Sequence, residues 1–285
     1  MRPLFSFKVP ATSANLGCGF DSVGLAVNLF LEVEVLGQSP QWQVIHDFGP
    51  VIATDASNLL VKSALDVVPD LEPHTLKVVS QIPLEHGLGS SSSAVVAGIE
   101  LADRLGGLNL SLEEKLRHAC KIEGHADNVA PAILGGLVVG VWDGEDFQYV
   151  QSDFPEVGLI AVIPDVTVNT HETRKILPKS MTFKEAVHIS AISNVMIASL
   201  LTGDIKKAVS LMEQDKFHEP YRQRFIPEFE KVRETVKEHG GYGVHISGSG
   251  STIMCLAPRA LRPKIMKALE QVIDAKVVEL EVYYH

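Results

Sequence analysis

Residues 83–98 carry the clearest chemical signal in the chain. They read Pro-Leu-Glu-His-Gly-Leu-Gly-Ser-Ser-Ser-Ser-Ala-Val-Val-Ala-Gly, a glycine-serine turn followed at once by an apolar pattern with helical spacing. Gly87 and Gly89 lack a Cβ, so the backbone can adopt positive φ and approach a ligand closely. The serines can cap the helix or direct hydroxyls toward a phosphate or a metal. Because a helix N-terminus presents free N–H groups, the pattern predicts a phosphate site rather than a flexible linker.

This turn matches neither of two common nucleotide-binding motifs. Residues 87–92 lack the third glycine of the dinucleotide-binding fingerprint, and no lysine stands where a P-loop requires one. Three further segments accompany the turn. They are residues 9–24 (Val-Pro-Ala-Thr-Ser-Ala-Asn-Leu-Gly-Cys-Gly-Phe-Asp-Ser-Val-Gly), residues 123–136 (Glu-Gly-His-Ala-Asp-Asn-Val-Ala-Pro-Ala-Ile-Leu-Gly-Gly) and residues 241–252 (Gly-Tyr-Gly-Val-His-Ile-Ser-Gly-Ser-Gly-Ser-Thr).

Together these four segments resemble the GHMP small-molecule kinases. The turn is similar to their phosphate loop, segments 9–24 and 123–136 resemble the homoserine kinases in particular, and segment 241–252 resembles a motif shared by the superfamily. The chain departs from the pattern at Cys18, where the family commonly has proline, and at Ser93, where it commonly has alanine. The short spacing from Glu123 to His125 follows one form of the family, since other members insert residues there.

The resemblance implies an activity and a set of site residues. The expected reaction is ATP-dependent phosphorylation of the side-chain hydroxyl of L-homoserine to O-phospho-L-homoserine, in threonine biosynthesis. ATP is expected at Pro83, Leu84, Glu85, His86, Gly87, Leu88, Gly89, Ser90, Ser91, Ser92 and Ser93, and Mg²⁺ at Ser90 and Glu123. L-Homoserine is expected at Asn15, Asp21, His125, Asn128, Thr170, Arg174 and Arg222.

The residue types on the substrate side suit an amino acid. A guanidinium such as Arg174 or Arg222 can fork onto a carboxylate, and Asp21 can complement an ammonium group. The catalytic residues are expected to be Asn128, Arg174 and Asp127. Two mechanisms stay open: Asp127 acts as a base, or transfer proceeds by positioning alone, with Asn128 orienting the hydroxyl.

Composition limits the other classes of function. The chain has 285 residues, 46% of them hydrophobic, and a formal net charge of −10. The absence of a basic tract argues against a nucleic-acid partner. No apolar run reaches the roughly 18 residues of a membrane span, and no secretion signal is evident. Three widely spaced cysteines indicate unpaired thiols, so we expect a cytoplasmic protein. The resemblance to the GHMP kinases further implies that the protein forms a homodimer.

Strand and helix patterns alternate without a strict βαβ rhythm, which indicates an α+β protein in two lobes. Capping boxes predict helices that begin after Ser111 and Thr182, and an apolar run predicts a strand over 244–256. The pattern breaks near 152–158, so we expect domains at 1–155, which binds ATP, and 156–285. The resemblance implies an N-terminal lobe like the second domain of ribosomal protein S5 and a ferredoxin-like C-terminal lobe.

Two other functions remain compatible with the sequence. One is a GHMP kinase that acts on another small alcohol, such as mevalonate or shikimate. The other is a non-catalytic metabolite sensor that keeps the fold. The paired arginines and Asp21 favour an amino acid over a sugar or mevalonate, and the intact loop favours catalysis.

Overall fold

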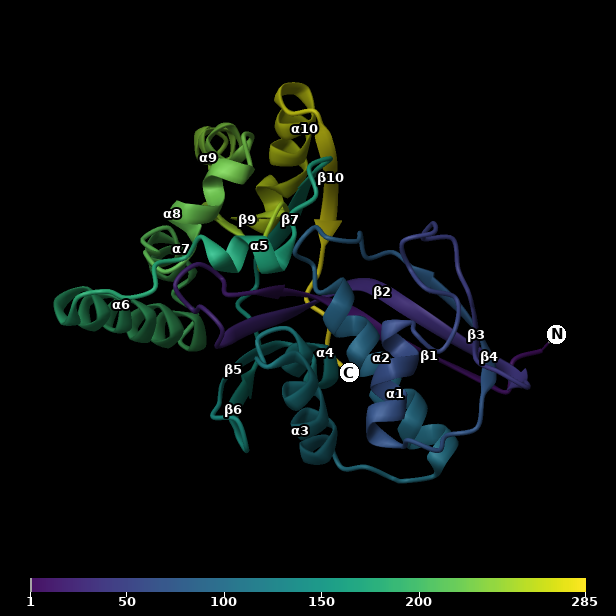
Figure 1. Ribbon diagram of the computed structural model, residues 1–285. Coiled ribbons are helices and arrows are strands. Elements are labelled where there is room, and N and C mark those ends of the chain that lie inside the picture. The colour runs from purple at the N-terminus through teal and green to yellow at the C-terminus, as the bar shows by residue number, and fades with distance from the viewer. Residues whose placement is uncertain (1) are drawn as a thin grey trace.

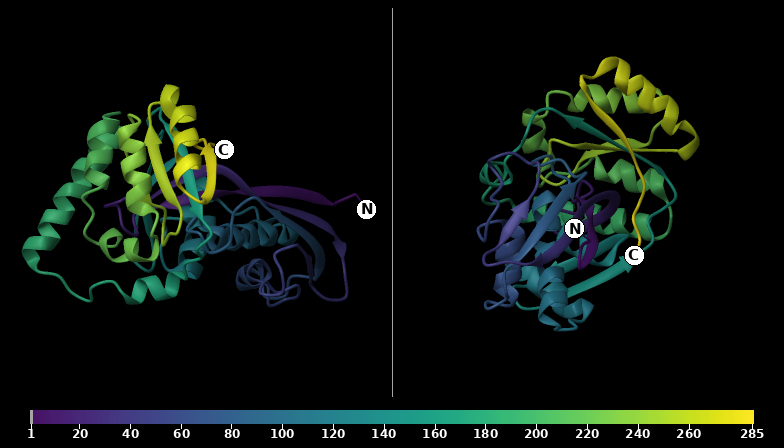
Figure 2. Two further views of the ribbon diagram at one scale, coloured as in Figure 1. Left: turned by 90° about the horizontal axis from the view of Figure 1, so that it is seen from above. Right: turned by 90° about the vertical axis from the view of Figure 1, so that its right-hand side faces the viewer.

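A computed structural model describes residues 2–285, apart from the side chain of His171. Two lobes lie side by side, the N-terminal half in purple to teal and the C-terminal half in green to yellow (Figures 1 and 2). The N-terminal sheet has the strand order β3-β4-β2-β5-β6, with β1 paired to β2. Its strands are β1 (Phe5–Ala14), β2 (Val23–Gln38), β3 (Gln43–Ile45), β4 (His74–Ser80), β5 (Leu137–Trp142) and β6 (Phe147–Ser152).

Four helices complete this lobe within the described chain: α1 (Leu59–Val67), α2 (Ser90–Gly106), α3 (Leu112–Glu123) and α4 (Val129–Leu134). The predicted capping box at Ser111 is present, with Glu114 as its partner. Helices α1 and α2 pack closely because Gly98 has no side chain, and a Cβ there would overlap the Leu60 carbonyl oxygen. This packing fixes the direction in which the first turn of α2 points.

The C-terminal sheet is antiparallel with the strand order β10-β7-β9-β8. Its strands are β7 (Gly158–Pro164), β8 (Gly243–Ile246), β9 (Ile253–Ala257) and β10 (Ala275–Leu280). In chain order this is a 4-1-3-2 sheet, which is the ferredoxin-like arrangement expected. The lobe also holds α5 (Thr170–Lys175), α6 (Phe183–Leu201), α7 (Ile205–Met212), α8 (Glu219–Arg222), α9 (Phe229–Glu238) and α10 (Arg262–Val272).

One prediction about this sheet is wrong. Residues 244–256 form no single strand; they form β8 and β9, an antiparallel pair separated by the turn 247–252. The turn is rich in glycine and serine, and Gly248 and Gly250 both have positive φ, so the chain reverses there. The apolar residues on either side belong to two strands that share one hydrophobic core.

Strand β7 joins the cores of the two lobes. Ile160 and Val162 face the cluster formed by α9 and α10, whereas Leu159 and Ala161 belong to the large core that continues into the N-terminal lobe. Alternate side chains of a strand point to opposite faces, so a strand buried on both faces reads as a continuous apolar run. The last residues also return to the N-terminal lobe, where Val282 bridges Val27. The boundary at 155/156 stays a prediction.

Two expectations from composition can be compared with the structure. All three cysteines are buried and unpaired, and burial raises the pKa of the Cys18 thiol to about 12. Among the helices that the structure describes, none is both long and apolar enough to cross a membrane.

Candidate active site

The loop 83–93 ends in α2 with a free helix N-terminus. Gly89 is the N-cap in the left-handed region, with φ 70°, and no side chain of the described residues caps this end of the helix. Of the two roles that the sequence left open to the serines, capping of this helix is not the one observed. The first N–H groups of α2 have no intrahelical partner, so they and the helix dipole can receive an anion.

The turn 247–252 packs against this loop and forms hydrogen bonds with it. Ser247 Oγ donates to the Gly87 carbonyl oxygen at 2.7 Å, and His86 Nδ1 lies 2.9 Å from Ser251 Oγ. A Cβ on Gly87 would overlap the Ser247 carbonyl oxygen, so only glycine allows the two segments to lie this close. The third glycine segment of the sequence therefore buttresses the first.

Not every residue of the loop faces the site. Leu88 is fully buried in the core, and Ser93 Oγ donates to the Pro10 and Gly89 carbonyl oxygens instead. Ser92 Oγ donates to Glu123 Oε1 at 2.7 Å. Sequence reasoning paired Glu123 with Ser90. Ser90 lines the same cavity, but the hydroxyl in contact with Glu123 is that of Ser92.

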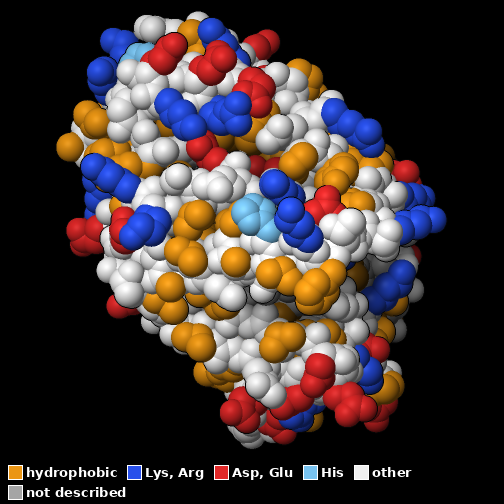
Figure 3. Space-filling view, turned by 90° about the vertical axis from the view of Figure 1, so that its left-hand side faces the viewer, with side chains coloured by type: hydrophobic (Ala, Val, Ile, Leu, Met, Phe, Trp, Pro, Cys, Tyr) orange, Lys and Arg blue, Asp and Glu red, His pale blue; other side chains and the backbone are white. Residues whose placement is uncertain are grey.

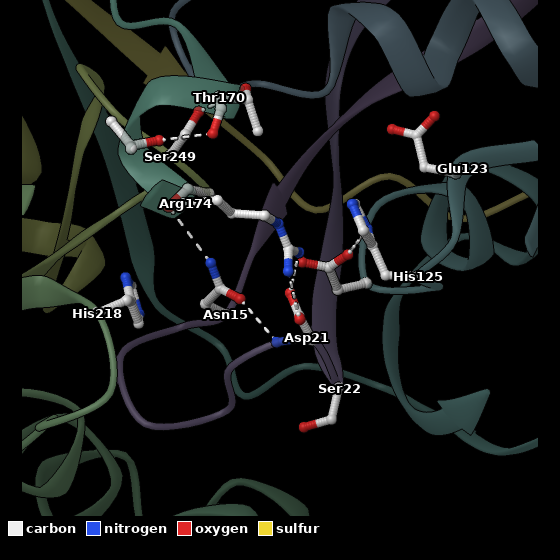
Figure 4. A network of polar contacts seen from close by, with 12 residues as sticks. Asn15, Asp21, Ser22, Glu123, His125, Thr170, Arg174, His218 and Ser249 are labelled. Carbon is white, nitrogen blue, oxygen red and sulfur yellow. Dashed lines mark hydrogen bonds and ion pairs between the residues drawn. The ribbon is translucent and has the colours of Figure 1, made fainter. Parts of the chain in front are cut away.

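A polar cavity of about 190 Å³ lies in front of this helix end. Arg174 forms two hydrogen bonds with the Asp21 carboxylate, at 3.0 and 2.6 Å, and this pair joins the two lobes (Figure 4). His125 Nδ1 lies 2.7 Å from Asp127 Oδ1. Burial opposes the charge on His125, but the hydrogen bond and charge of Asp127 outweigh it, so the pKa of His125 is raised.

Hydrogen bonds to neighbouring protein groups fix the side chains of Asn128 and Asn15. Thr12 Oγ1 donates to Asn128 Oδ1 at 2.8 Å, which leaves the Asn128 NH₂ group to face the cavity. Asn15 accepts the Asp21 N–H at 3.0 Å and donates to the Gly248 carbonyl oxygen at 3.3 Å. Asn15 therefore shapes the loop 15–21, in which Asn15, Leu16, Gly17 and Asp21 all have positive φ.

Charge is distributed unevenly across the cavity. The Asp21, His125 and Asp127 ligand atoms lie within 4.8 Å of one another. The guanidinium groups of Arg174 and Arg222 supply positive charge in the same cavity. Burial together with the charge of Arg174 lowers the pKa of Arg222 to about 10. The cavity thus offers carboxylates that suit a cationic group and guanidinium groups that suit an anionic group, with Arg174 and Asp21 already paired to each other. Thr170, whose Oγ1 lies 3.0 Å from Ser249 Oγ, closes the same cavity.

An apolar cavity of about 530 Å³ lies on the other side of the loop. Its wall includes Leu31, Val44, Phe48, Val51, Ile52, Leu59, Leu60, Val78, Leu84 and Ala94. Glu85, Ser90 and Ser91 line both cavities, so the phosphate loop forms the boundary between them. Asn58 also lines the apolar cavity, but its side chain caps α1 and donates to the Ala53 carbonyl oxygen at 2.7 Å.

Comparisons with known proteins agree with this geometry. The profile of the GHMP kinases N terminal domain matches residues 56–136, and that of the GHMP kinases C terminal region matches residues 196–275. The homoserine kinase of Streptococcus equi subsp. zooepidemicus is 48% identical over 276 residues, which is 96% of each chain. The homoserine kinase of Bacillus cereus ATCC 14579 is 48% identical over 283 residues, 99% of this chain and 95% of the relative. The chain belongs to the GHMP kinase family.

A solved structure supports the same assignment. The homoserine kinase of Cytophaga hutchinsonii superposes with a TM-score of 0.85 at 30% identity, and covers 97% of this chain and 95% of its own. Within the GHMP kinases, therefore, this chain groups with the homoserine kinases. The two-lobed α+β fold expected from the motifs is confirmed.

This GHMP kinase also has site residues that sequence reasoning missed. They are Phe20, the contact of Ser92 with Glu123, His218, which accepts a hydrogen bond from Arg222, and the wall of the apolar cavity apart from Leu84. Two of these had a signal in the sequence: Phe20 lies next to Asp21 within the segment 9–24, and His218 stands four residues before Arg222, one helical turn away. The apolar cavity is built from residues of separate strands and helices, so no local pattern marks it.

Proposed function

We propose that the protein transfers the γ-phosphoryl group of ATP to the side-chain hydroxyl of L-homoserine, the step that yields O-phospho-L-homoserine for threonine biosynthesis. One observation carries the proposal: the uncapped N-terminus of α2 lies between an apolar cavity and a cavity lined by both carboxylates and guanidinium groups. A nucleotide has an apolar base, an anionic phosphate chain and a reacting end, in that order. The family assignment raises the same expectation.

ATP fits this order. Its adenine would occupy the apolar cavity, where burial of an aromatic ring is favourable. The phosphates would follow residues 83–93 to the free N–H groups of α2. Backbone donors of this kind bind phosphate without a lysine, which agrees with the sequence of the loop. The γ-phosphoryl group would then reach the cavity that Asp21 and Arg222 line.

L-Homoserine fits the charges of the polar cavity. Its carboxylate would meet Arg222 and Arg174, and its ammonium group would meet Asp21 and the carboxylate of Asp127. Arg222 is 2% exposed and makes no ion pair among the described residues. A buried cation without an anionic partner is costly, so a carboxylate bound beside it is stabilised. Mevalonate and shikimate have no ammonium group for the anionic side.

Mg²⁺ is part of the proposal. Glu123 offers a carboxylate beside the Ser92 hydroxyl, and Ser90 lines the same cavity, which is the set of hard oxygen donors that this ion prefers. Ser90 and Glu123 are the proposed ligands, with Ser92 orienting Glu123. When bound, the ion would neutralise charge on the transferred phosphoryl group.

We favour transfer by positioning over a dedicated base. Asp127 is held by the His125 imidazole at 2.7 Å, so one of its carboxylate oxygens already has a hydrogen-bond partner inside the protein. Asn128 would donate from its NH₂ group to the substrate hydroxyl while Thr12 fixes its other end. Phosphoryl transfer passes through a loose transition state, so alignment contributes more than early deprotonation.

The deciding assay measures ADP release with ATP, Mg²⁺ and each of L-homoserine, mevalonate and shikimate. We expect turnover with L-homoserine only. Arg222→Met should raise the KM for L-homoserine at least about 10-fold, because a hydrogen bond to a charged group is typically worth about 1.5–3 kcal/mol. Arg224→Met, two residues away on an exposed side chain, is the matched control. Turnover with mevalonate, or none with any alcohol, would contradict the proposal.

A homodimer in the cytoplasm completes the proposal. Helix α6 has Phe183, Val187, Val195 and Leu201 between 45% and 86% exposed, and these lie within about a third of its circumference. Figure 3 shows the side of the molecule on which α6 lies, where hydrophobic side chains gather across the middle of the face. Apolar surface of this kind favours association, and the free thiols fit a reducing compartment.

The oligomeric state can be measured by sedimentation. We expect a species of twice 31.0 kDa, and Phe183→Glu should yield the monomer. Val272→Glu is the control, because Val272 is also an exposed apolar residue but lies on α10. A monomeric wild type would contradict the dimer.

A further inference from the structure

The Arg222 guanidinium is held entirely by neutral groups. Its Nη1 donates to His218 Nδ1 at 3.1 Å and to the Gly248 carbonyl oxygen at 2.8 Å. Its Nε, also buried, has no hydrogen-bond partner among the described residues. By contrast, Arg174 is already paired with Asp21. Arg222 therefore has an unused donor and no ion-pair partner in direct contact, although the charges of Asp21, Asp127 and Asp215 act on it from farther away. Its orientation depends on the two acceptors at Nη1.

His218 is one of these acceptors and is completely buried. Because Arg222 can only donate, His218 Nδ1 must accept and carries no hydrogen. His218 Nε2 lies 2.9 Å from the Gly17 carbonyl oxygen, so it carries the hydrogen and donates. Burial lowers the pKa of His218 to about 4 and keeps the ring neutral. Protonation at Nδ1 would place two donors against each other and break the contact with Arg222.

The backbone around His218 is fixed as well. The Asp215 carboxylate accepts the N–H groups of Phe217, His218 and Glu219 at 2.8 to 3.0 Å. The imidazole cannot shift without breaking these bonds or the bond to Gly17. It thus ties the turn before α8 to the loop 15–21, from which Asp21 reaches the cavity (Figure 4).

Phe20 completes this arrangement. The His218 ring stacks on the Phe20 ring with 5.3 Å between centroids. The guanidinium carbons of Arg174 and Arg222 lie 5.5 and 5.4 Å from the Phe20 centroid. An aromatic face attracts cations, so one ring brings together two guanidinium groups that otherwise repel each other.

We propose that His218 and Phe20 are positioning residues that aim the unpartnered edge of Arg222 at the carboxylate of the amino acid, and thereby set the preference for an α-amino acid over the corresponding amino alcohol. This inference rests on the proposed function. It assigns the preference for an α-amino acid to the neutral imidazole of His218, which acts through Arg222 rather than through contact with the substrate.

The test compares L-homoserine with 3-aminopropan-1-ol, which has the hydroxyl and the amine but no carboxylate. His218→Phe keeps the stacking on Phe20 and removes both hydrogen bonds. We expect its KM for L-homoserine to rise about 10-fold or more, with the KM for ATP within about twofold. The preference for L-homoserine over the amino alcohol should fall by the same factor. His218→Gln offers one acceptor and one donor, and should restore most of the preference.

Controls separate positioning from general loss of stability. His245→Phe removes another buried histidine, whose Nδ1 contacts only the neighbouring Ile246 carbonyl oxygen among the described residues, and should leave the preference unchanged. In an Arg222→Met background, His218→Phe should change kcat/KM for L-homoserine less than about twofold. The inference would be overturned if His218→Phe lowered kcat/KM in the Arg222→Met background as much as it does in the wild type. It would also be overturned if His218→Phe lowered kcat/KM equally for L-homoserine and 3-aminopropan-1-ol.

The tautomer provides a readout that needs no turnover. In ¹⁵N-histidine-labelled wild type, His218 should give the signals of a neutral ring with hydrogen on Nε2, and these should shift in Arg222→Met. Hydrogen on Nδ1 would overturn the inference whatever the activity, and this measurement also decides the case if His218→Phe does not fold. A wild type with the expected tautomer but no turnover of L-homoserine would contradict the proposed function alone.

Discussion

A single added carbon at Gly89 tests whether the backbone of the loop 83–93 builds the phosphate site. Gly89 has φ 70°, and a Cβ there would overlap Thr12 Oγ1 and lie 3.2 Å from Asn128 Oδ1. Gly107, at the other end of the same helix, has φ 61° and nothing described within 4 Å of its Cβ position. Gly89→Ala and Gly107→Ala therefore share the backbone strain and differ in the contact.

The expected magnitudes follow from these contacts. A side chain in the left-handed region costs roughly 1–2 kcal/mol, so both variants should lose about that much free energy of unfolding. Gly89→Ala also displaces the Thr12 hydroxyl, which donates to Asn128 at 2.8 Å, and this adds about 1 kcal/mol. The same displacement moves the first N–H groups of α2, so kcat/KM for ATP should fall about 10- to 100-fold.

Two measurements check this prediction. Urea unfolding gives the free energies, and initial rates of ADP release at saturating L-homoserine give kcat/KM for ATP. Gly107→Ala should keep its ATP kinetics within about twofold. If Gly89→Ala loses stability as Gly107→Ala does yet binds and uses ATP normally, the loop does not position the phosphates and the reasoning is refuted.

Three further predictions concern the polar cavity. Glu123→Gln should slow Mg²⁺-dependent turnover by roughly 10- to 150-fold. Glu113→Gln, on the exposed start of the same helix, should change this rate less than twofold. Equal effects of the two substitutions would mean that Glu123 is an ordinary surface charge. Under single-turnover conditions, Asn128→Ala should slow transfer at least as much as Asp127→Asn, and a fully active Asn128→Ala beside an inactive Asp127→Asn would establish base catalysis instead. Because the pKa of His125 is raised above 6.5 in the folded state, its stabilisation is present below pH 6.5 and is lost as the pH rises through the folded-state pKa; His125→Asn should therefore cost more unfolding free energy at about pH 5.5 than at about pH 9, and a cost independent of pH would contradict it.

Local features of the fold could be predicted from the sequence because their partners lie close along the chain. The capping boxes at Ser111 and Thr182 each need one glutamate three residues later, and both form. The same locality explains an error, since an apolar pattern cannot show that residues 247–252 reverse direction beneath the loop at Gly87.

The sequence motifs predicted which residue types the site contains, but they did not predict which of these residues contact one another. Asp21 and Arg174 stand 153 positions apart, and His218 and the Gly17 carbonyl 201 positions apart. Spacing carries no information about such pairs, because they meet only when the two lobes pack against each other. The sequence therefore determined which residue types the site contains and the helix end that can bind phosphate. Only the packing of the two lobes decided that Arg222 is buried against a neutral imidazole, with no ion-pair partner among the described residues.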